Sequence, residues 1–249
     1  METVAKAGWT FKRYSASNGI DIPYQMYIPK NLDETKKYPV ILFMHGMGSV
    51  GSEGEHISQT VARFLTLVTA SKYKDEVLII APQLPKGHRW IELDSQDLSA
   101  YKSGIYAYDD AVMSVYLQAA KELFDDCFAK FPVDRNRIYG YGNSMGAFAT
   151  FYLACTYPDL YAAIVPVSGG CDPNKASVIK DIPMWVFHGD ADVLIEWLGS
   201  KTIVENVIAL GATNAKLTVF PGVGHDAVRC FVAAAETEGL LDWIFAQSK

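Results

Sequence analysis

This chain of 249 residues lacks the long apolar runs and basic clusters that mark membrane and nucleic-acid proteins. No uninterrupted apolar run approaches the ~20 residues that a membrane-spanning helix needs. Lys and Arg never form a run longer than two, and the net charge is −6, so we expect neither a nucleic-acid partner nor a membrane-bound protein. Residues 1–6 lack the apolar core of a signal peptide. We therefore expect a cytoplasmic protein, although a secreted one whose leader was removed would read the same.

Cofactor and metal motifs are equally scarce. The four cysteines, Cys127, Cys155, Cys171 and Cys230, do not have the spacing of a metal site, and no Gly-x-Gly-x-x-Gly follows a first strand. We expect no cofactor and no metal. Cys127 and Cys155 fall in apolar helical patterns and are expected in the core. Cys171 and Cys230 fall in predicted loops, and whether they pair in a disulfide is left open.

The composition is that of a folded α/β protein. Half of the residues are hydrophobic and 20% are charged, which supplies a large core, and the length fits one domain over residues 1–249. Apolar runs alternate with helical patterns, which predicts a mostly parallel sheet covered by helices on both faces. An antiparallel hairpin is expected first, at residues 9–14 and 20–28. The other expected strands are 39–44, 77–82, 137–141, 162–167, 183–188 and 216–220, and the expected helices are 53–70, 109–130, 145–156, 195–210 and 231–246.

The most informative motif is Gly142-Asn143-Ser144-Met145-Gly146, which lies between a predicted strand and a predicted helix. This order is typical of a nucleophile elbow, where a strained turn lifts a serine hydroxyl clear of the sheet. The glycines allow a tight turn and close backbone approach. The alternative is a serine that merely caps the helix. The context favours a nucleophile, because further catalytic residue types follow in the expected order.

A serine hydroxyl becomes a good nucleophile only when a base takes its proton and a carboxylate orients that base. His225 follows the last predicted strand and is the candidate base. Asp190 and Asp192 follow the strand before it, and the pattern alone leaves both open as the acid. One of them is expected to bond its own turn instead.

The predicted strand 39–44 ends in His45-Gly46-Met47-Gly48. Esterases with a nucleophile elbow often take one oxyanion-hole amide from such a loop and the other from the residue after the serine. The backbone N–H groups of Met47 and Met145 are therefore the predicted oxyanion donors.

Three further residues are candidates for substrate contact: His45, Gln83 and Trp90. Each has a structural alternative. His45 could brace its loop, Gln83 could cap a strand end, and Trp90 could pack under the loop at 83–106.

With these motifs in view, the chain resembles α/β-hydrolases of the bacterial predicted-esterase and peptidase branch, near the feruloyl and acetylxylan esterases. The resemblance rests on 43–46, 81–83, 88–90, 142–146, 187–192 and 222–225. It implies that Asp192, in a His-Gly-x-x-Asp pattern, is the acid. Relatives often continue the first glycine loop with a Glu-Arg pair, which this chain lacks.

The resemblance implies a serine carboxylesterase in which Ser144, His225 and Asp192 hydrolyse small soluble esters through an acyl-enzyme. Acetyl and feruloyl esters of plant polysaccharide are candidate substrates. A peptidase or aminoacyl hydrolase on the same residues is the alternative, and a non-catalytic binding protein is disfavoured by the complete residue set. The short crossover between 167 and 183 leaves no room for a large lid, and the oligomeric state is left open.

Overall fold

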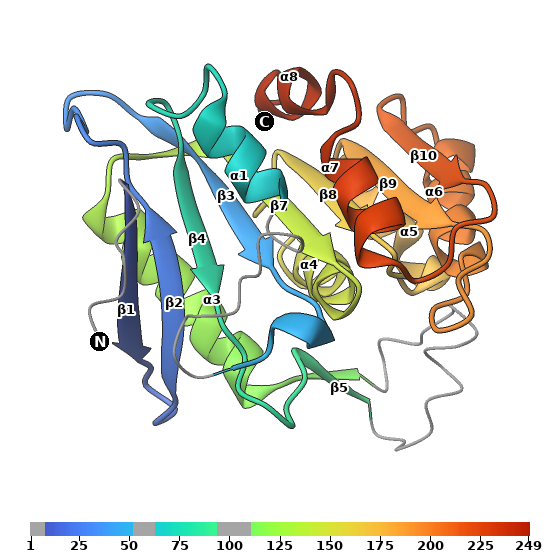
Figure 1. The fold of residues 1–249 in the computed structure, drawn as a ribbon, viewed down its shortest axis with the longest axis horizontal. Coiled ribbons are helices and arrows are strands. Elements are labelled where there is room, and N and C mark those ends of the chain that lie inside the picture. The colour runs from blue at the N-terminus through green and yellow to red at the C-terminus, as the bar shows by residue number, and fades with distance from the viewer. Residues whose placement is uncertain (1–7, 52–62, 94–110) are drawn as a thin grey trace.

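The computed structural model describes residues 8–51, 63–93 and 111–249 (Figure 1). Eight of the described strands form one sheet in the order β1-β2-β4-β3-β7-β8-β9-β10. The hairpin of β1 and β2 is antiparallel, and β2 joins β4 antiparallel, whereas the remaining pairs are parallel. This confirms the predicted mostly parallel sheet with an antiparallel N-terminal hairpin. The strands are β1 Trp9–Ser15, β2 Asp21–Tyr27, β3 Tyr38–Met44, β4 Leu78–Pro82, β7 Val133–Asn143, β8 Ala163–Val167, β9 Met184–Gly189 and β10 Ala215–Phe220.

Helices cover both faces of the sheet, as Figure 1 shows. The alternation along β3 illustrates why: Val40 and Leu42 belong to one hydrophobic core, and Ile41 and Phe43 belong to the other. A strand with both faces buried reads as a continuous apolar run, and each such side chain contributes roughly 1.5–3 kcal/mol. One face is covered by α3 (Val115–Lys130), α4 (Met145–Thr156), α5 (Ala176–Ile179) and α6 (Leu198–Ala209), and the other by α1 (Arg63–Ala70), α7 (Ala233–Ala235) and α8 (Leu240–Phe245).

Two predicted helices begin later than expected. Residues Ala111–Met113, expected in the helix 109–130, form strand β6 and pair with β5 (Ile91–Leu93). The helix itself starts after Ser114, whose hydroxyl accepts a hydrogen bond from the amide of Leu117. An N-cap serine therefore sets this boundary. The helix predicted at 195–210 begins at Leu198, and most of the helix predicted at 53–70 lies outside the described residues.

The single helix predicted at 231–246 is wrong. The structure has a π-helical turn, η4 (Ala227–Val232), followed by α7 and α8. The Asp226 carboxylate accepts from the amides of Val228 and Arg229, which starts the segment early. Gly239, with φ +76°, separates α7 from α8. This left-handed conformation is one that glycine adopts without strain.

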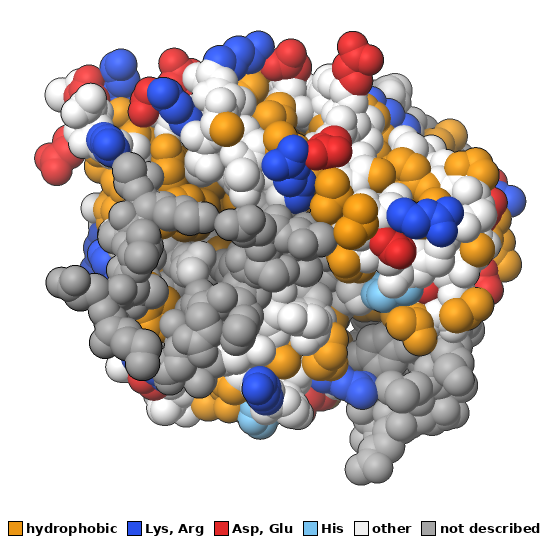
Figure 2. Space-filling model, in the orientation of Figure 1, with side chains coloured by type: hydrophobic (Ala, Val, Ile, Leu, Met, Phe, Trp, Pro, Cys, Tyr) orange, Lys and Arg blue, Asp and Glu red, His pale blue; other side chains and the backbone are white. Residues whose placement is uncertain are grey.

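One face of the molecule shows how its basic side chains are distributed. On the face drawn in Figure 2, Lys and Arg side chains are scattered among acidic ones rather than gathered in one area. No helix within the described ranges combines the length and apolar character that crossing a bilayer requires.

Candidate active site

Ser144 lies on the sharp turn where β7 ends and α4 begins. Its backbone has φ +52° and ψ −121°, an unusual conformation for a residue with a side chain. Such a residue costs on the order of 1–3 kcal/mol and persists only where its surroundings impose it. The strand-to-helix turn predicted from the Gly-x-Ser-x-Gly motif is therefore present, and the serine side chain is half-buried.

The two motif glycines make this turn sterically feasible. A Cβ on Gly146 would overlap the carbonyl oxygen of Met44 in β3, and a Cβ on Gly142 would overlap the carbonyl oxygen of Gly146. The strand, the helix and the neighbouring strand thus approach within backbone contact. This close packing holds the serine at the carboxyl edge of the sheet.

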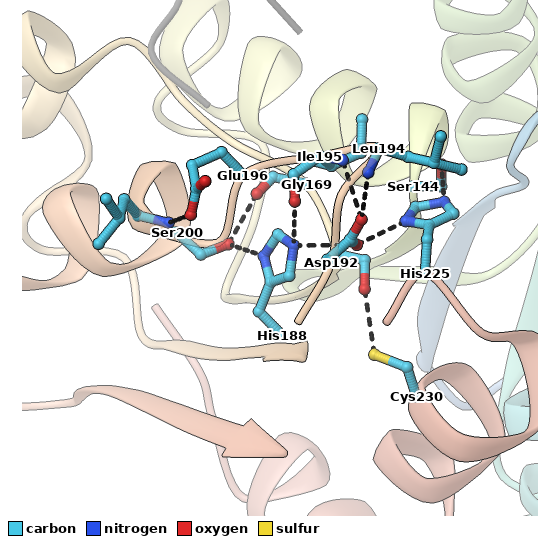
Figure 3. A network of polar contacts seen from close by, with 12 residues as sticks. Ser144, Gly169, His188, Asp192, Leu194, Ile195, Glu196, Ser200, His225 and Cys230 are labelled. Carbon is cyan, nitrogen blue, oxygen red and sulfur yellow. Dashed lines mark hydrogen bonds and ion pairs between the residues drawn. The ribbon is translucent and has the colours of Figure 1, made fainter. Parts of the chain in front are cut away.

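The structure brings Ser144, His225 and Asp192 together in one hydrogen-bonded chain (Figure 3). The Nε2 atom of His225 lies 2.9 Å from the Oγ of Ser144. Its Nδ1 lies 2.6 Å from Oδ2 of Asp192. The loops after β7, β9 and β10 supply these residues, because the carboxyl ends of parallel strands share one edge. Asp190 instead accepts a hydrogen bond from the amide of Gly222, in the loop after β10, at 2.6 Å. The expectation that the aspartate other than the acid would bond its own turn is wrong, because the carboxylate that accepts from its own turn is that of Asp192.

The Asp192 carboxylate is held in its ionised form. Burial opposes ionisation, but hydrogen bonds from His188 and His225 outweigh it and hold the pKa of Asp192 far below its usual range. The amides of Leu194 and Ile195 also donate to its Oδ1, at 3.0 and 2.9 Å. Because the negative charge of Asp192 is held beside Nδ1 of His225, the ring is oriented with Nε2 toward the serine.

Met47 and Met145 are the first residues of two helical segments, η1 (Met47–Ser49) and α4. The first amides of a helix have no acceptor within that helix. The two segments are adjacent, because a Cβ built on Gly46 would lie 3.2 Å from the Cβ of Ser144. The loop of Met47 therefore lies close to the nucleophile, and the role of both amides as oxyanion donors stays a prediction.

The phospholipase/carboxylesterase family model matches residues 31–238, which include the elbow and both other residues of the chain of hydrogen bonds. This protein belongs to that family. The predicted resemblance to esterases of the α/β-hydrolase fold is thereby confirmed.

Three similar proteins are a thioesterase, a depolymerase and an esterase. Acyl-protein thioesterase 1 of Neurospora crassa is 26% identical over 217 residues, covering 75% of this chain and 80% of that protein. Poly(3-hydroxyalkanoate) depolymerase C of Paucimonas lemoignei is 42% identical over 50 residues, 20% of this chain and 12% of that protein. The crystal structure of a thermostable esterase is 26% identical with a TM-score of 0.83, covering 98% of this chain and 64% of that one. The chain thus spans less than two thirds of the depolymerase and of the thermostable esterase.

The predicted substrate contacts of this esterase-family chain need correction. His45, Gln83 and Trp90 are 0, 1 and 0% exposed, so all three lie beneath the surface instead of lining it. The indole Nε1 of Trp90 donates to the carbonyl oxygen of His45 at 3.0 Å. The Gln83 amide donates to the carbonyl oxygen of Ser49 at 3.1 Å. Through these hydrogen bonds, Trp90 and Gln83 stabilise the backbone on either side of Met47.

The His45 side chain also stabilises this loop, through both of its ring nitrogens. The amide of Leu84 donates to its Nε2 at 2.9 Å, so the ring hydrogen sits on Nδ1 and is donated to the carbonyl oxygen of Gly46 at 2.7 Å. Burial lowers the pKa of His45 to about 4, although the bond to Gly46 opposes this. The imidazole is therefore neutral at physiological pH and acts as a fixed link between two loops.

The cysteines are all reduced in this structure. Cys171 and Cys230 do not pair: the Sγ of Cys230 lies 3.0 Å from the Oγ of Ser168, whereas that of Cys171 lies 3.8 Å from the Sγ of Cys155. Cys127 is buried, as predicted, and Cys155 is only half-buried. Within the described residues, no group of three or more His, Cys, Asp or Glu is arranged to hold a metal.

Sequence reasoning missed His188 as a member of the site. It ends the same strand that precedes Asp192, and its Nε2 lies 3.3 Å from Oδ2 of that carboxylate. A histidine at the end of a strand buried on both faces was the available signal, since a buried polar side chain needs a partner.

Proposed function

We propose that this protein is a serine carboxylesterase that hydrolyses small soluble esters through an acyl-enzyme on Ser144. The observation that carries the proposal is the continuous chain from the Ser144 hydroxyl through His225 to Asp192, with bonds of 2.9 and 2.6 Å. In a family of carboxylic ester hydrolases, this chain is the arrangement that activates a serine.

The first half of the reaction acylates Ser144. His225 Nε2 takes the hydroxyl proton as the Oγ bonds to the ester carbonyl carbon, and the carbonyl oxygen gains the negative charge. The amides of Met47 and Met145 stabilise that charge, a contribution of roughly 3 kcal/mol for one donor. His225 then gives its proton to the alcohol oxygen as the carbon–oxygen bond breaks, and the alcohol leaves.

The second half frees the enzyme. A water molecule gives a proton to His225 and attacks the acyl carbon, and the second tetrahedral intermediate collapses as the proton returns to Ser144 Oγ. The charge on Asp192 stabilises the imidazolium in both halves. The acid leaves, and serine and imidazole return to their starting forms.

The side chains around the site support a weakly polar substrate. Met47 follows β3, Val193 and Leu194 follow Asp192, and Val228 lies three residues after His225; they are 47, 84, 58 and 61% exposed. No charge is offered by these four residues, so an uncharged acyl or alcohol group suits them better than a charged one. Because Trp90 is fully buried, it offers no stacking surface to a feruloyl group, and short acyl groups are the favoured substrates.

The test compares wild type with Ser144→Ala on p-nitrophenyl acetate, butyrate and decanoate, on methyl ferulate, on an acyl thioester and on an aminoacyl p-nitroanilide. We expect acetate and butyrate to turn over fastest, and the variant to lose activity by about 10⁶-fold with its fold intact. Activity retained by Ser144→Ala would refute the assignment. Dominant ferulate, thioester or anilide turnover would replace the proposed substrate by a feruloyl ester, a thioester or a peptide-like amide.

A further inference from the structure

His188 is a fully buried polar side chain beside the site, with 0% exposure at the end of β9. A buried imidazole is costly unless both ring nitrogens find partners. Figure 3 shows the ring between Asp192 on one side and Ser200 on the other. Both ring nitrogens of this histidine are in fact within hydrogen-bond distance of polar atoms.

The Nε2 atom of His188 faces two acceptors. It lies 3.1 Å from the carbonyl oxygen of Ile195 and 3.3 Å from Oδ2 of Asp192. Neither acceptor carries a hydrogen in this environment, so the ring hydrogen must sit on Nε2. The Nε2–H group of His188 thus contacts both the Asp192 carboxylate and the carbonyl oxygen of Ile195. The amide of Ile195 in turn donates to Oδ1, the other oxygen of that carboxylate.

The Nδ1 side fixes the ring to the rest of the fold. Nδ1 lies 2.8 Å from the Oγ of Ser200 in α6, and that oxygen lies 2.7 Å from the carbonyl oxygen of Gly169. A Cβ on Gly169 would overlap the Cβ of Ala147, three residues after Ser144. The ring is therefore tied to both the helix α6 and the segment that packs on the nucleophile helix.

We infer that His188 is a positioning residue that holds the Asp192 carboxylate in line with His225. Without it, Oδ2 keeps only the bond to His225, and the turn 192–195 loses its tie to the ring. The carboxylate would then rotate away from Nδ1 in part of the population. This inference rests on the proposed function, because alignment matters only if His225 is the base.

The test compares His188→Leu with His188→Gln. Leucine fills the space but donates no hydrogen bond, whereas the glutamine amide nitrogen can reach the position of Nε2. We expect kcat to fall about 10- to 100-fold in the leucine variant, the same range as for the loss of a hydrogen-bond partner of a metal-binding side chain. KM should stay within about twofold, since no substrate contact is lost. The glutamine variant should recover most of the loss.

A proton NMR measurement separates alignment from stability. The short bond between His225 Nδ1 and Asp192 should give a far-downfield N–H resonance in wild type. We expect this resonance to vanish or broaden in His188→Leu and to return in His188→Gln. A leucine variant with wild-type kcat, or with the resonance unchanged, would overturn the inference. So would a glutamine variant that folds but recovers nothing.

Ser200→Ala provides a milder second variant in case leucine prevents folding. It leaves His188 in place but removes the hydroxyl between Nδ1 and Gly169, and we expect a smaller fall in kcat with a broadened resonance. Ser168→Ala is its matched control, because it removes an equally buried hydroxyl that contacts Cys230 instead. Equal kcat in both variants would contradict the inference. If wild type hydrolyses no ester, the proposed function fails, while the resonance still tests the alignment.

Discussion

Asp192 and Asp190 lie two residues apart but face different partners. The Asp192 carboxylate is 2.6 Å from His225 Nδ1, whereas that of Asp190 accepts from the amide of Gly222. Asp192→Asn should therefore lower kcat by about 10⁴-fold, the loss known for this change in a serine triad. Asp190→Asn keeps an oxygen for Gly222 and should stay within about threefold of wild type. Steady-state kinetics on p-nitrophenyl butyrate measure both, and the reverse ranking would assign the acid to Asp190.

Protein stability should depend on His45 in mildly acidic solution. Its pKa is about 4 in the folded protein, against an ordinary value of 6.5, because burial disfavours the charged ring. Between these pH values the unfolded chain binds the proton more readily, so stability is full above about 6.5 and is lost as the pH falls to about 4. The expected loss is about 3 kcal/mol.

Urea unfolding between pH 4 and 7.5 measures this loss, with His45→Gln as the variant that cannot titrate. The pH dependence of its free energy of unfolding should be flatter than that of wild type over the same range. Identical slopes for both proteins would show that His45 does not titrate in this way.

The elbow should not tolerate a methyl group at Gly146. The added Cβ would overlap the backbone oxygen of Met44, which belongs to a central strand and cannot move without disturbing the sheet. Gly146→Ala should cost more than about 2 kcal/mol of stability and most of the activity. At Gly48, an added Cβ meets nothing within 4 Å, so Gly48→Ala should change stability by less than about 0.5 kcal/mol. Thermal unfolding compares the two, and equal losses would contradict the steric explanation.

Mild oxidation should join Cys155 to Cys171. Their sulfur atoms are 3.8 Å apart, close enough for a small rotation to bring them together, whereas Cys230 is occupied by Ser168. A diazene oxidant such as diamide accepts the two thiol hydrogens as the disulfide forms. Peptide mass spectrometry should find the 155–171 linkage and lose it in Cys155→Ser. A linkage between Cys171 and Cys230 would contradict the observed packing.

Much of the fold follows from local patterns in the sequence. Fully apolar runs such as 39–44 identified the buried parallel strands, because a strand that is covered on both faces is apolar along its whole length. Helix boundaries that depend on a single capping side chain were harder to predict. The hydroxyl of Ser114 and the carboxylate of Asp226 each begin a helix at a point that the apolar periodicity does not reveal.

The site residues also differ in how far local sequence predicts them. Chain order and the positions of the strand ends nominate Ser144 and His225, whereas the choice of Asp192 over Asp190 depended on the family resemblance. The roles of Trp90 and His188 depend on what packs against them. Trp90 donates to a backbone carbonyl 45 residues away, and His188 contacts Ser200 in a separate helix. Such long-range partners cannot be assigned from one sequence.

Covalent labelling with a fluorophosphonate tests Ser144 as the nucleophile most directly. The serine oxygen displaces fluoride and keeps the phosphonyl group, and peptide mass spectrometry locates it. The wild-type protein should carry one adduct, on Ser144, with complete loss of esterase activity, and Ser144→Ala should remain unlabelled. An adduct on another residue, or esterase activity that survives full labelling of Ser144, would contradict the assignment of Ser144 as the nucleophile.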